Sequence, residues 1–410
     1  MLKKIFSSEL GKGAFILFIT INIFNFLNYL FHFAMGRLLG PADYGVLAVL
    51  MSVVYIFSVP SEAIQNIISR YTSKLNVKKE YGKIKFLMFK SLKKASNIAF
   101  WVFLIALLFS IWLSKFLDID FWLIFITDIL IFASFLNPVT KGILQGRKKF
   151  GLLGNNMILE SGFKLLFAIL FVLIGFKVFG AMIGVIIGFT TGLMFSIYFN
   201  RDILKKKSMK VSFKGIYPQS VPYFITMLVI FLVLSLDIIL AKRFFSPEIA
   251  GKYAVISMLG KMIFFGTIAI GKAMFPLTSE KTDNNESSIE LFKKSFVIIA
   301  SLCTFVVLIY AFFPKLVIGI LYGSQYLEMA PYLVYSGIAL SFLSLSNIIL
   351  IYGLSTNKIK NSYYLFSFLI IEVGLFYLFH DNVMEFILGF MVSSIIMFIG
   401  SFLIIKNKEN

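Results

Sequence analysis

The sequence has little of what most catalytic sites use. It contains one cysteine, Cys303, two histidines, His32 and His380, and 20 acidic residues among 410. A single cysteine excludes a disulfide within the chain, and the separated histidines with no Cys–His pair argue against a zinc site. No Gly-Lys-Ser/Thr phosphate loop and no Gly-x-Ser-x-Gly nucleophile turn occurs. We therefore expect no enzyme, no catalytic residue, no metal site and no cofactor.

Hydrophilic stretches of domain size are also missing. The longest hydrophilic connections, Arg70–Lys94 and Thr278–Lys294, are too short to fold as a catalytic domain. Apolar residues make up 59% of the chain, and about 20 consecutive ones span a bilayer. These runs predict an all-α polytopic membrane protein with 12 transmembrane helices. The predicted helices are Ala14–Met35, Val46–Ile68, Ala95–Leu113, Phe121–Leu136, Met157–Phe176, Val178–Phe199, Val221–Ala241, Tyr253–Phe275, Phe296–Phe313, Tyr332–Tyr352, Tyr363–Phe379 and Val383–Ile405.

Negative charge is scarce, and the 39 basic residues leave a net charge of +19. Most of these residues lie in alternate connections and near both termini, as in Lys74–Lys94, Lys141–Lys149 and Arg201–Lys214. Positive loops stay in the cytoplasm, so we expect a multi-pass protein of the cell membrane with both termini cytoplasmic. The basic loops are expected to contact anionic membrane lipid rather than nucleic acid. No obligate protein partner is evident.

A weak internal repeat suggests that the chain was built from two halves. Arg37–Val49 follows the first predicted helix, and Arg243–Val255 follows the seventh with Arg, Pro, Gly, Ala and Val at matching positions. Each half holds an even number of helices, so both copies cross the membrane in the same direction. We expect two parallel six-helix lobes around a central cavity, 1–205 and 206–410. The alternative is that helix-connecting turns converge on similar residues.

The run Gly36-Arg-Leu-Leu-Gly-Pro-Ala-Asp-Tyr-Gly45 resembles the signature of polysaccharide-transport (O-antigen/oligosaccharide) flippases. These belong to the multidrug/oligosaccharidyl-lipid/polysaccharide exporter superfamily. The helix number, chain length and two-lobe organisation fit this family along the whole chain, although the lipid II flippases of the superfamily usually carry two further helices. The resemblance implies export of a lipid-linked oligosaccharide by alternating access.

Polar residues within the first two predicted helices form stripes. Such residues cost free energy at membrane depth and tend to face the interior of a bundle. They line a polar cavity, or they hydrogen-bond neighbouring helices instead. Pro60, just before the second stripe, is expected to break the helix locally. The stripes supply the substrate-binding candidates Asn22, Asn25, His32, Arg37, Gln65, Asn66 and Arg70, and the ion-coupling candidate Glu62.

The other buried charges are more scattered. Glu160 and Lys164 lie four residues apart in the fifth helix and are expected to pair with each other, either as a structural ion pair or as a phosphate-binding lysine with its resting partner. Lys261 is the deeper lysine of the eighth helix and a second phosphate candidate. Isolated carboxylates are either ion-coupling sites or helix-to-helix hydrogen-bond partners. They are Asp128, Asp237 and Glu372.

The leading hypothesis is a flippase that moves a polyprenyl-(pyro)phosphate-linked oligosaccharide from the cytoplasmic to the outer leaflet, possible coupling ions being H⁺ or Na⁺. Amide and hydroxyl side chains would replace water around the sugar, and basic residues would attract the phosphate. A cation-coupled multidrug exporter of the same superfamily is the first alternative. A membrane glycosyltransferase or polymerase is the second, and the short connections argue against it.

Overall fold

The computed structural model describes residues 9–210, 221–359 and 361–406, and those residues contain no strand. Nine helical stretches in this part of the chain are long and apolar enough to cross a membrane. Two of them, Ile19–Val77 and Phe150–Phe199, each contain two predicted crossings, and the shorter apolar helix Ser362–Leu378 supplies another. The predicted all-α, multi-pass fold with twelve crossings is therefore confirmed.

Glycine allows the chain to reverse direction within two of these stretches. Helix α2 (Glu9–Val77) contains one residue outside helical geometry, Gly40, whose φ of 75° lies in the left-handed region. Gly175 has a φ of 103° within η1 (Val172–Phe176), between two helices that pack along each other. Side chains other than glycine rarely adopt such angles, so these two positions end one crossing and begin the next.

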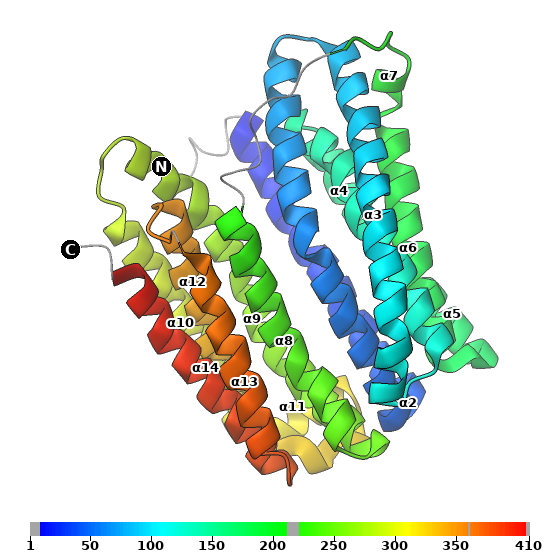
Figure 1. Cartoon of the computed structure of the whole chain (residues 1–410), viewed down its shortest axis with the longest axis vertical. Helices are drawn as coiled ribbons and strands as arrows, with labels where there is room; N and C mark the ends of the chain where they lie inside the picture. The colour runs from blue at the N-terminus through cyan, green and yellow to red at the C-terminus, as the bar shows by residue number, and fades with distance from the viewer. Residues whose placement is uncertain (1–8, 211–220, 360, 407–410) are drawn as a thin grey trace. The chain divides into compact units, whose positions relative to one another are not determined.

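The described chain separates into two compact units, of which the first contains the described residues of Met1–Leu39 and Val53–Pro218. In this unit α3 packs on α4, α4 on α6, and α5 on α6 (Figure 1). The glycines of α4 allow close approach to α2, because a Cβ on Gly142 would meet the carbonyl oxygen of Gln65. The other helices are α3 (Tyr81–Leu117), α4 (Phe121–Gly146), α5 (Phe150–Phe171), α6 (Lys177–Phe199) and α7 (Arg201–Leu204).

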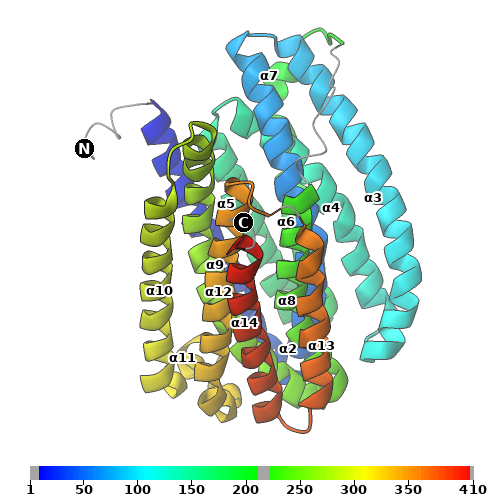
Figure 2. The same cartoon turned by 60° about the vertical axis from the view of Figure 1, so that its left-hand side comes forward.

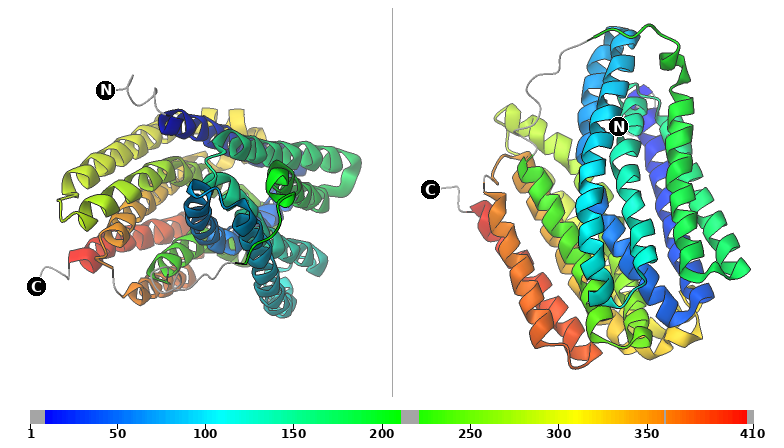
Figure 3. Two further views of the ribbon diagram at one scale, coloured as in Figure 1. Left: turned by 90° about the horizontal axis from the view of Figure 1, so that it is seen from above. Right: turned by 45° about the vertical axis from the view of Figure 1, so that its right-hand side comes forward.

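The second unit contains Gly40–Ser52 together with the described residues of Gln219–Asn410. Helix α12 lies at its centre and packs against α9, α10 and α14, while α13 packs on α8 and α14 (Figure 2). The left view of Figure 3 shows the same helices from above. The elements of the second unit are α8 (Val221–Phe244), α9 (Pro247–Asp283), α10 (Ile289–Phe312), α11 (Pro314–Leu321), η3 (Ser324–Tyr332), α12 (Leu333–Ser355), η4 (Ser362–Leu365), α13 (Phe366–Leu378) and α14 (Val383–Lys406).

Matching positions of the internal repeat meet inside the second unit. A Cβ on Gly45 would lie 2.9 Å from the Cα of Gly251, and a Cβ on Gly251 would overlap the carbonyl of Pro41. Close by, the hydroxyl groups of Tyr44 and Tyr322 lie 3.2 Å apart in the buried core. The resembling run 36–45 is therefore a packing motif at its C-terminal end, where only glycine allows the two backbones to approach.

The structure corrects three expectations about local geometry. The hydrophilic connection Arg70–Lys94 is mostly helical, since α2 continues to Val77 and α3 begins at Tyr81. Lys and Glu favour helices, and 37 residues in α3 extend about 55 Å, beyond the ~30 Å hydrocarbon layer. Pro60 does not break α2, whose only non-helical residue is Gly40. The short helices α11 and η3 were not expected.

Candidate functional site

A lysine buried in the first unit forms the first candidate site. Lys164 on α5 is only 7% exposed, and its Nζ donates a hydrogen bond to the side-chain oxygen of Asn28 on α2. The same ammonium lies 4.5 Å from the centroid of the Phe31 ring. An ammonium held by a neutral amide and an aromatic face keeps its charge uncompensated by a direct carboxylate contact. Such a group attracts an anion.

The neighbouring carboxylate pairs with a different lysine from the one expected. Glu160, one turn before Lys164 on α5, accepts a hydrogen bond from Nζ of Lys141 on α4 at 2.5 Å. The predicted direct Glu160–Lys164 pair is therefore wrong as a salt bridge, although the Glu160 charge still acts on Lys164. Gly192 on α6 makes room for this arrangement, because a Cβ there would overlap the Glu160 carboxylate. Two lysines and one carboxylate leave this region with a net positive charge.

The candidates on the first half of α2 lie in different surroundings. His32 is buried, and its Nε2 lies 3.3 Å from the Tyr55 hydroxyl. Asn25 is half-buried, whereas Asn22 and Arg37 are exposed. The sequence stripe therefore does not form one uniform polar surface. Asn28, which flanks the stripe, is the residue that reaches Lys164.

The candidates on the second half of α2 lie near α4. The Gln65 amide donates to the side-chain oxygen of Gln145 at 2.8 Å, which links the two helices. Glu62 is half-buried, and Asn66 and Arg70 are exposed. Asp128 on α4 is 1% exposed and accepts a hydrogen bond from Ser110 on α3 at 2.6 Å. Asp128 thus hydrogen-bonds the neighbouring helix.

A second buried cluster lies in the other unit. Asp237 on α8 and Lys261 on α9 are both fully buried and form an ion pair with Nζ and Oδ1 3.0 Å apart. The other carboxylate oxygen of Asp237 accepts a hydrogen bond from Ser257 and lies 3.5 Å from the Tyr253 hydroxyl. The depth of Lys261 predicted a phosphate contact, and in the structure its ammonium pairs with Asp237 instead.

Glu372 completes this cluster from α13. It is 1% exposed, and neither carboxylate oxygen has a hydrogen-bond partner among the described residues. Its charge acts on Asp237, Lys261 and Tyr253. The structure thus brings together Asp237, Lys261 and Glu372, which are distant in sequence, in a site within the second unit.

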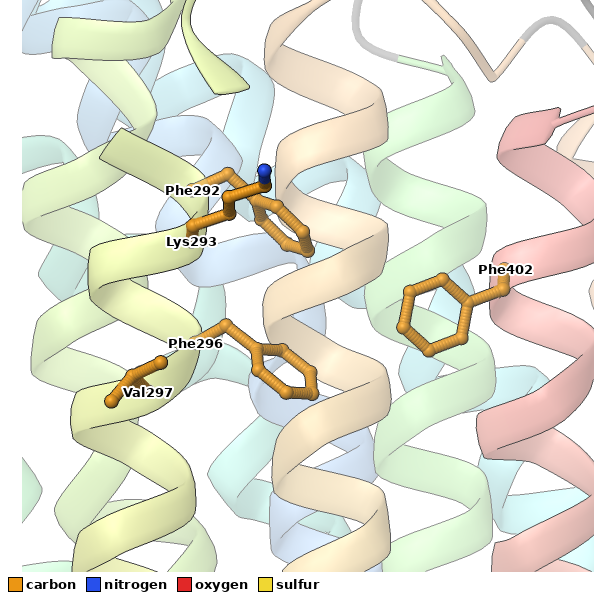
Figure 4. Close-up of a pocket in the computed structure, with 5 residues that line it drawn as sticks. All are labelled: Phe292, Lys293, Phe296, Val297 and Phe402. Atoms are coloured by element: carbon orange, nitrogen blue, oxygen red, sulfur yellow. The ribbon is translucent and has the colours of Figure 1, made fainter. Parts of the chain in front are cut away.

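One open hollow in the second unit is lined by apolar side chains and is unsuited to a polar ligand. It encloses about 220 Å³ beside α10 and α14 and is lined by Phe292, Phe296, Val297 and Phe402, with Lys293 at its edge (Figure 4). Aromatic faces exposed on a membrane-spanning helix contact lipid. We assign this hollow to lipid packing.

An ion pair outside the spanning segments fixes the end of α4 in the first unit. The guanidinium of Arg147 donates both to Asp202 on α7 and to Asn200, and Lys149 donates to Asp202 at 3.1 Å. These hydrogen bonds, that of Arg147 first, hold the pKa of the Asp202 carboxyl below its usual range, against the opposing effect of partial burial. The cluster joins the α4–α5 connection to the end of α6.

Acidification is expected to weaken this cluster. A carboxyl whose folded pKa is lowered stabilises the fold above its unfolded pKa of about 3.9 and loses this contribution as the pH falls towards the folded value. Since the Asp202 side chain is 49% exposed, we expect at most about 1 kcal/mol. When the pH is lowered from about 5 to about 3, the unfolding temperature of Asp202→Asn should therefore fall slightly less than that of the wild type. An equal loss in both proteins would show that Asp202 contributes nothing.

Three contributors to the clusters, Lys141, Tyr253 and Ser257, were missed from the sequence. Lys141 was assigned only to a basic connection, yet it reaches Glu160. Tyr253 and Ser257 precede Lys261 at steps of four, so the spacing alone places all three on one face of α9. That spacing was the available signal. No spacing rule connects Lys141 with Glu160, because the contact depends on how α4 packs near α5.

Comparison with known proteins identifies relatives of the chain. The family described as "Polysaccharide biosynthesis protein" matches residues 34–331. A search of curated proteins finds no match.

Solved structures share the fold. One is described as "Reverse polarity of binding pocket suggests different function of a MOP superfamily transporter from Pyrococcus furiosus Vc1 (DSM3638)", with 16% identity, a TM-score of 0.63, and coverage of 97% of this chain and 96% of that one. Another is an outward-facing multidrug resistance MATE family transporter of the MOP superfamily, with 15% identity, a TM-score of 0.64, and coverage of 97% of both chains.

Proposed function

Because the chain belongs to the polysaccharide biosynthesis protein family, we propose that it is a flippase for a polyprenyl-(pyro)phosphate-linked oligosaccharide. The family match confirms the resemblance drawn from residues 36–45, and the MOP transporter fold supports a transporter rather than an enzyme. Flipping carries the sugar headgroup from the cytoplasmic leaflet to the outer leaflet while the lipid tail stays in hydrocarbon.

The observation that carries the substrate class is the buried ammonium of Lys164, whose direct contacts are the neutral Asn28 and Phe31. A diphosphate headgroup is anionic, and a lysine bound to Asn28 and Phe31 can exchange these neutral contacts for phosphate oxygens without breaking a salt bridge. Lys141 lies nearby and retains Glu160 as its partner. Six polar residues of α2 remain candidates for sugar and phosphate contacts. They are the exposed Arg37, Arg70, Asn22 and Asn66 and the half-buried Asn25 and Gln65. His32, whose ring lies beside the Tyr55 hydroxyl, also remains a candidate for substrate binding.

The membrane potential gives the proposed transport a direction. With a negative cell interior and cytoplasmic termini, an anion moving outward gains about 2.3 kcal/mol per charge per 100 mV. Charge carried across in this way drives export without ATP hydrolysis. Glu62, Asp128 and Glu160 remain candidate sites for an additional inward ion.

The multidrug exporter is the second candidate, supported by the shared fold with a MATE transporter. A cation-coupled drug exporter requires a site that attracts organic cations. A net positive cluster in the first unit favours an anionic substrate instead.

Deletion of the gene tests the proposed function. We expect an undecorated or partly assembled sugar-lipid to accumulate on the cytoplasmic leaflet. A membrane-impermeant glycan probe added from outside should not label it there. If synthesis of the sugar-lipid itself stopped, an enzyme would replace the flippase as the better account. If sugar-lipids were normal and cationic drugs accumulated, the drug exporter would be correct.

A further inference from the structure

Glu372 is a buried carboxyl group without a hydrogen-bonding partner. It lies on α13, which packs against α8 and α14, and only 1% of it is exposed. Neither carboxylate oxygen meets a donor among the described residues. An ionised carboxylate without donors in a membrane interior costs far more than a neutral acid, so the neutral form is favoured.

The charged groups around Glu372 strengthen this preference. Asp237 on α8 and Lys261 on α9 already neutralise each other through their 3.0 Å ion pair. An ionised Glu372 would therefore add a net negative charge beside Asp237 in a fully buried site. Tyr253 is another titratable group on which the Glu372 charge acts, and its hydroxyl lies 3.5 Å from Asp237.

Among the described residues, the charged groups that act on Glu372 are Asp237 and Lys261. On α14 the described acidic residue is Glu385, which binds Asn382 at the first turn. On α8, Lys242 and Arg243 lie more than one turn beyond Asp237. The site thus holds two carboxyl groups and one ammonium, and it is neutral only with one proton added.

We propose that Glu372 binds and releases the proton that is coupled to transport, in a site where Lys261 alternates between the two carboxyl groups. On release, the Glu372 O–H bond breaks, the proton passes to water admitted by a conformational change, and the remaining carboxylate takes up the Lys261 ammonium. On binding, the proton returns to Glu372 and Lys261 returns to Asp237. The site therefore carries one exchangeable proton per cycle.

A proton fits this site better than a metal cation. The ammonium of Lys261 occupies the position at Asp237 where a sodium ion would provide the compensating charge. The described residues contain no group of three or more His, Cys, Asp or Glu side chains placed to hold a metal ion. Neither carboxylate oxygen of Glu372 has a hydrogen-bonding partner among the described residues, whereas Na⁺ requires several oxygen ligands. The carboxyl group is therefore better suited to H⁺ than to Na⁺.

The first test measures protonation and does not require transport. Infrared spectra of the purified protein in lipid nanodiscs near neutral pH should contain the carbonyl stretch of a protonated carboxyl group in an apolar site. The band is identified by subtracting the spectrum of each variant from that of the wild type. Glu372→Gln should remove this band, whereas Glu290→Gln, which changes an exposed carboxylate on α10, should keep it. Gln is isosteric with the neutral acid, so the fold should persist. An unchanged band in Glu372→Gln would overturn the proposal.

The second test depends on the proposed function and separates the two ideas. In vesicles with the membrane potential clamped at zero, an imposed gradient of one pH unit should bias accumulation of the sugar-lipid about tenfold, because one pH unit equals one decade of proton activity. Glu372→Gln should transport without this bias. If the wild type transports with no pH dependence, only the proton assignment fails. If neither protein transports but the infrared band is present, only the flippase assignment fails. A gradient of Na⁺ that replaced the proton gradient would also overturn the proton assignment.

Discussion

Replacing Lys164 with glutamate is expected to lower the rate of sugar-lipid flipping by about thirtyfold or more. The substitution removes the ammonium that rests on Asn28 and Phe31 and puts a second negative charge one turn from Glu160. Loss of one buried charge contact to an anion costs about 2–5 kcal/mol, and 1.4 kcal/mol corresponds to tenfold. Flipping by the purified variants in vesicles provides the measurement.

Matched variants separate a binding role from a folding role. Lys115→Glu makes the same charge reversal at an exposed position of α3 in the same unit and should flip at the wild-type rate. Lys164→Arg keeps the positive charge and should retain most of the activity. If Lys164→Glu is folded, as judged by its elution as a single species and its thermal unfolding, and still flips normally, the phosphate assignment is wrong.

Adding one methyl group at Gly251 is expected to destabilise the second unit strongly. The new Cβ would overlap the carbonyl of Pro41, which is backbone and cannot rotate away, and Gly45 packs against the same site. Overpacking of this kind costs about 1–3 kcal/mol, and more where the backbone has to move. We therefore expect Gly251→Ala to unfold several degrees below the wild type in detergent and to give a lower yield.

A second glycine of α9 supplies the control. A Cβ at Gly266 meets nothing within 4 Å, so Gly266→Ala should leave thermal unfolding unchanged or raise it slightly by favouring the helix. Both variants add one methyl group to α9, and they differ in whether that methyl group meets another backbone. If both variants unfold at the same temperature, the contact between Gly45, Gly251 and Pro41 does not limit packing.

The sequence predicted the helices better than the contacts between them. Apolar length alone located every crossing, because the cost of placing a polar backbone in hydrocarbon leaves the chain little choice. The turn at Gly40 suits glycine, since few other residues adopt a φ of 75°. The helical continuation through Lys74–Val77 and Tyr81–Lys94 was missed because hydropathy marks the membrane boundary and not the end of a helix.

Partners of buried charges were harder to predict. Helical spacing placed Glu160 and Lys164 on one face, but Lys141 from α4 lies closer to the carboxylate. Asp237 and Lys261 were each treated as isolated, although they form one ion pair across α8 and α9. Such pairs depend on helix rotation and on small residues such as Gly192, and a single sequence does not encode that geometry in any local pattern.

The most direct measurement of the central claim uses purified protein in vesicles that carry a lipid-linked oligosaccharide in both leaflets. A glycosidase added outside cleaves only the headgroups that face it. With the protein present and the outside made electrically positive, we predict cleavage of nearly all of the sugar-lipid, and of about half when the vesicles contain Lys164→Glu. Protection of half of the substrate in vesicles with folded wild-type protein would contradict the account.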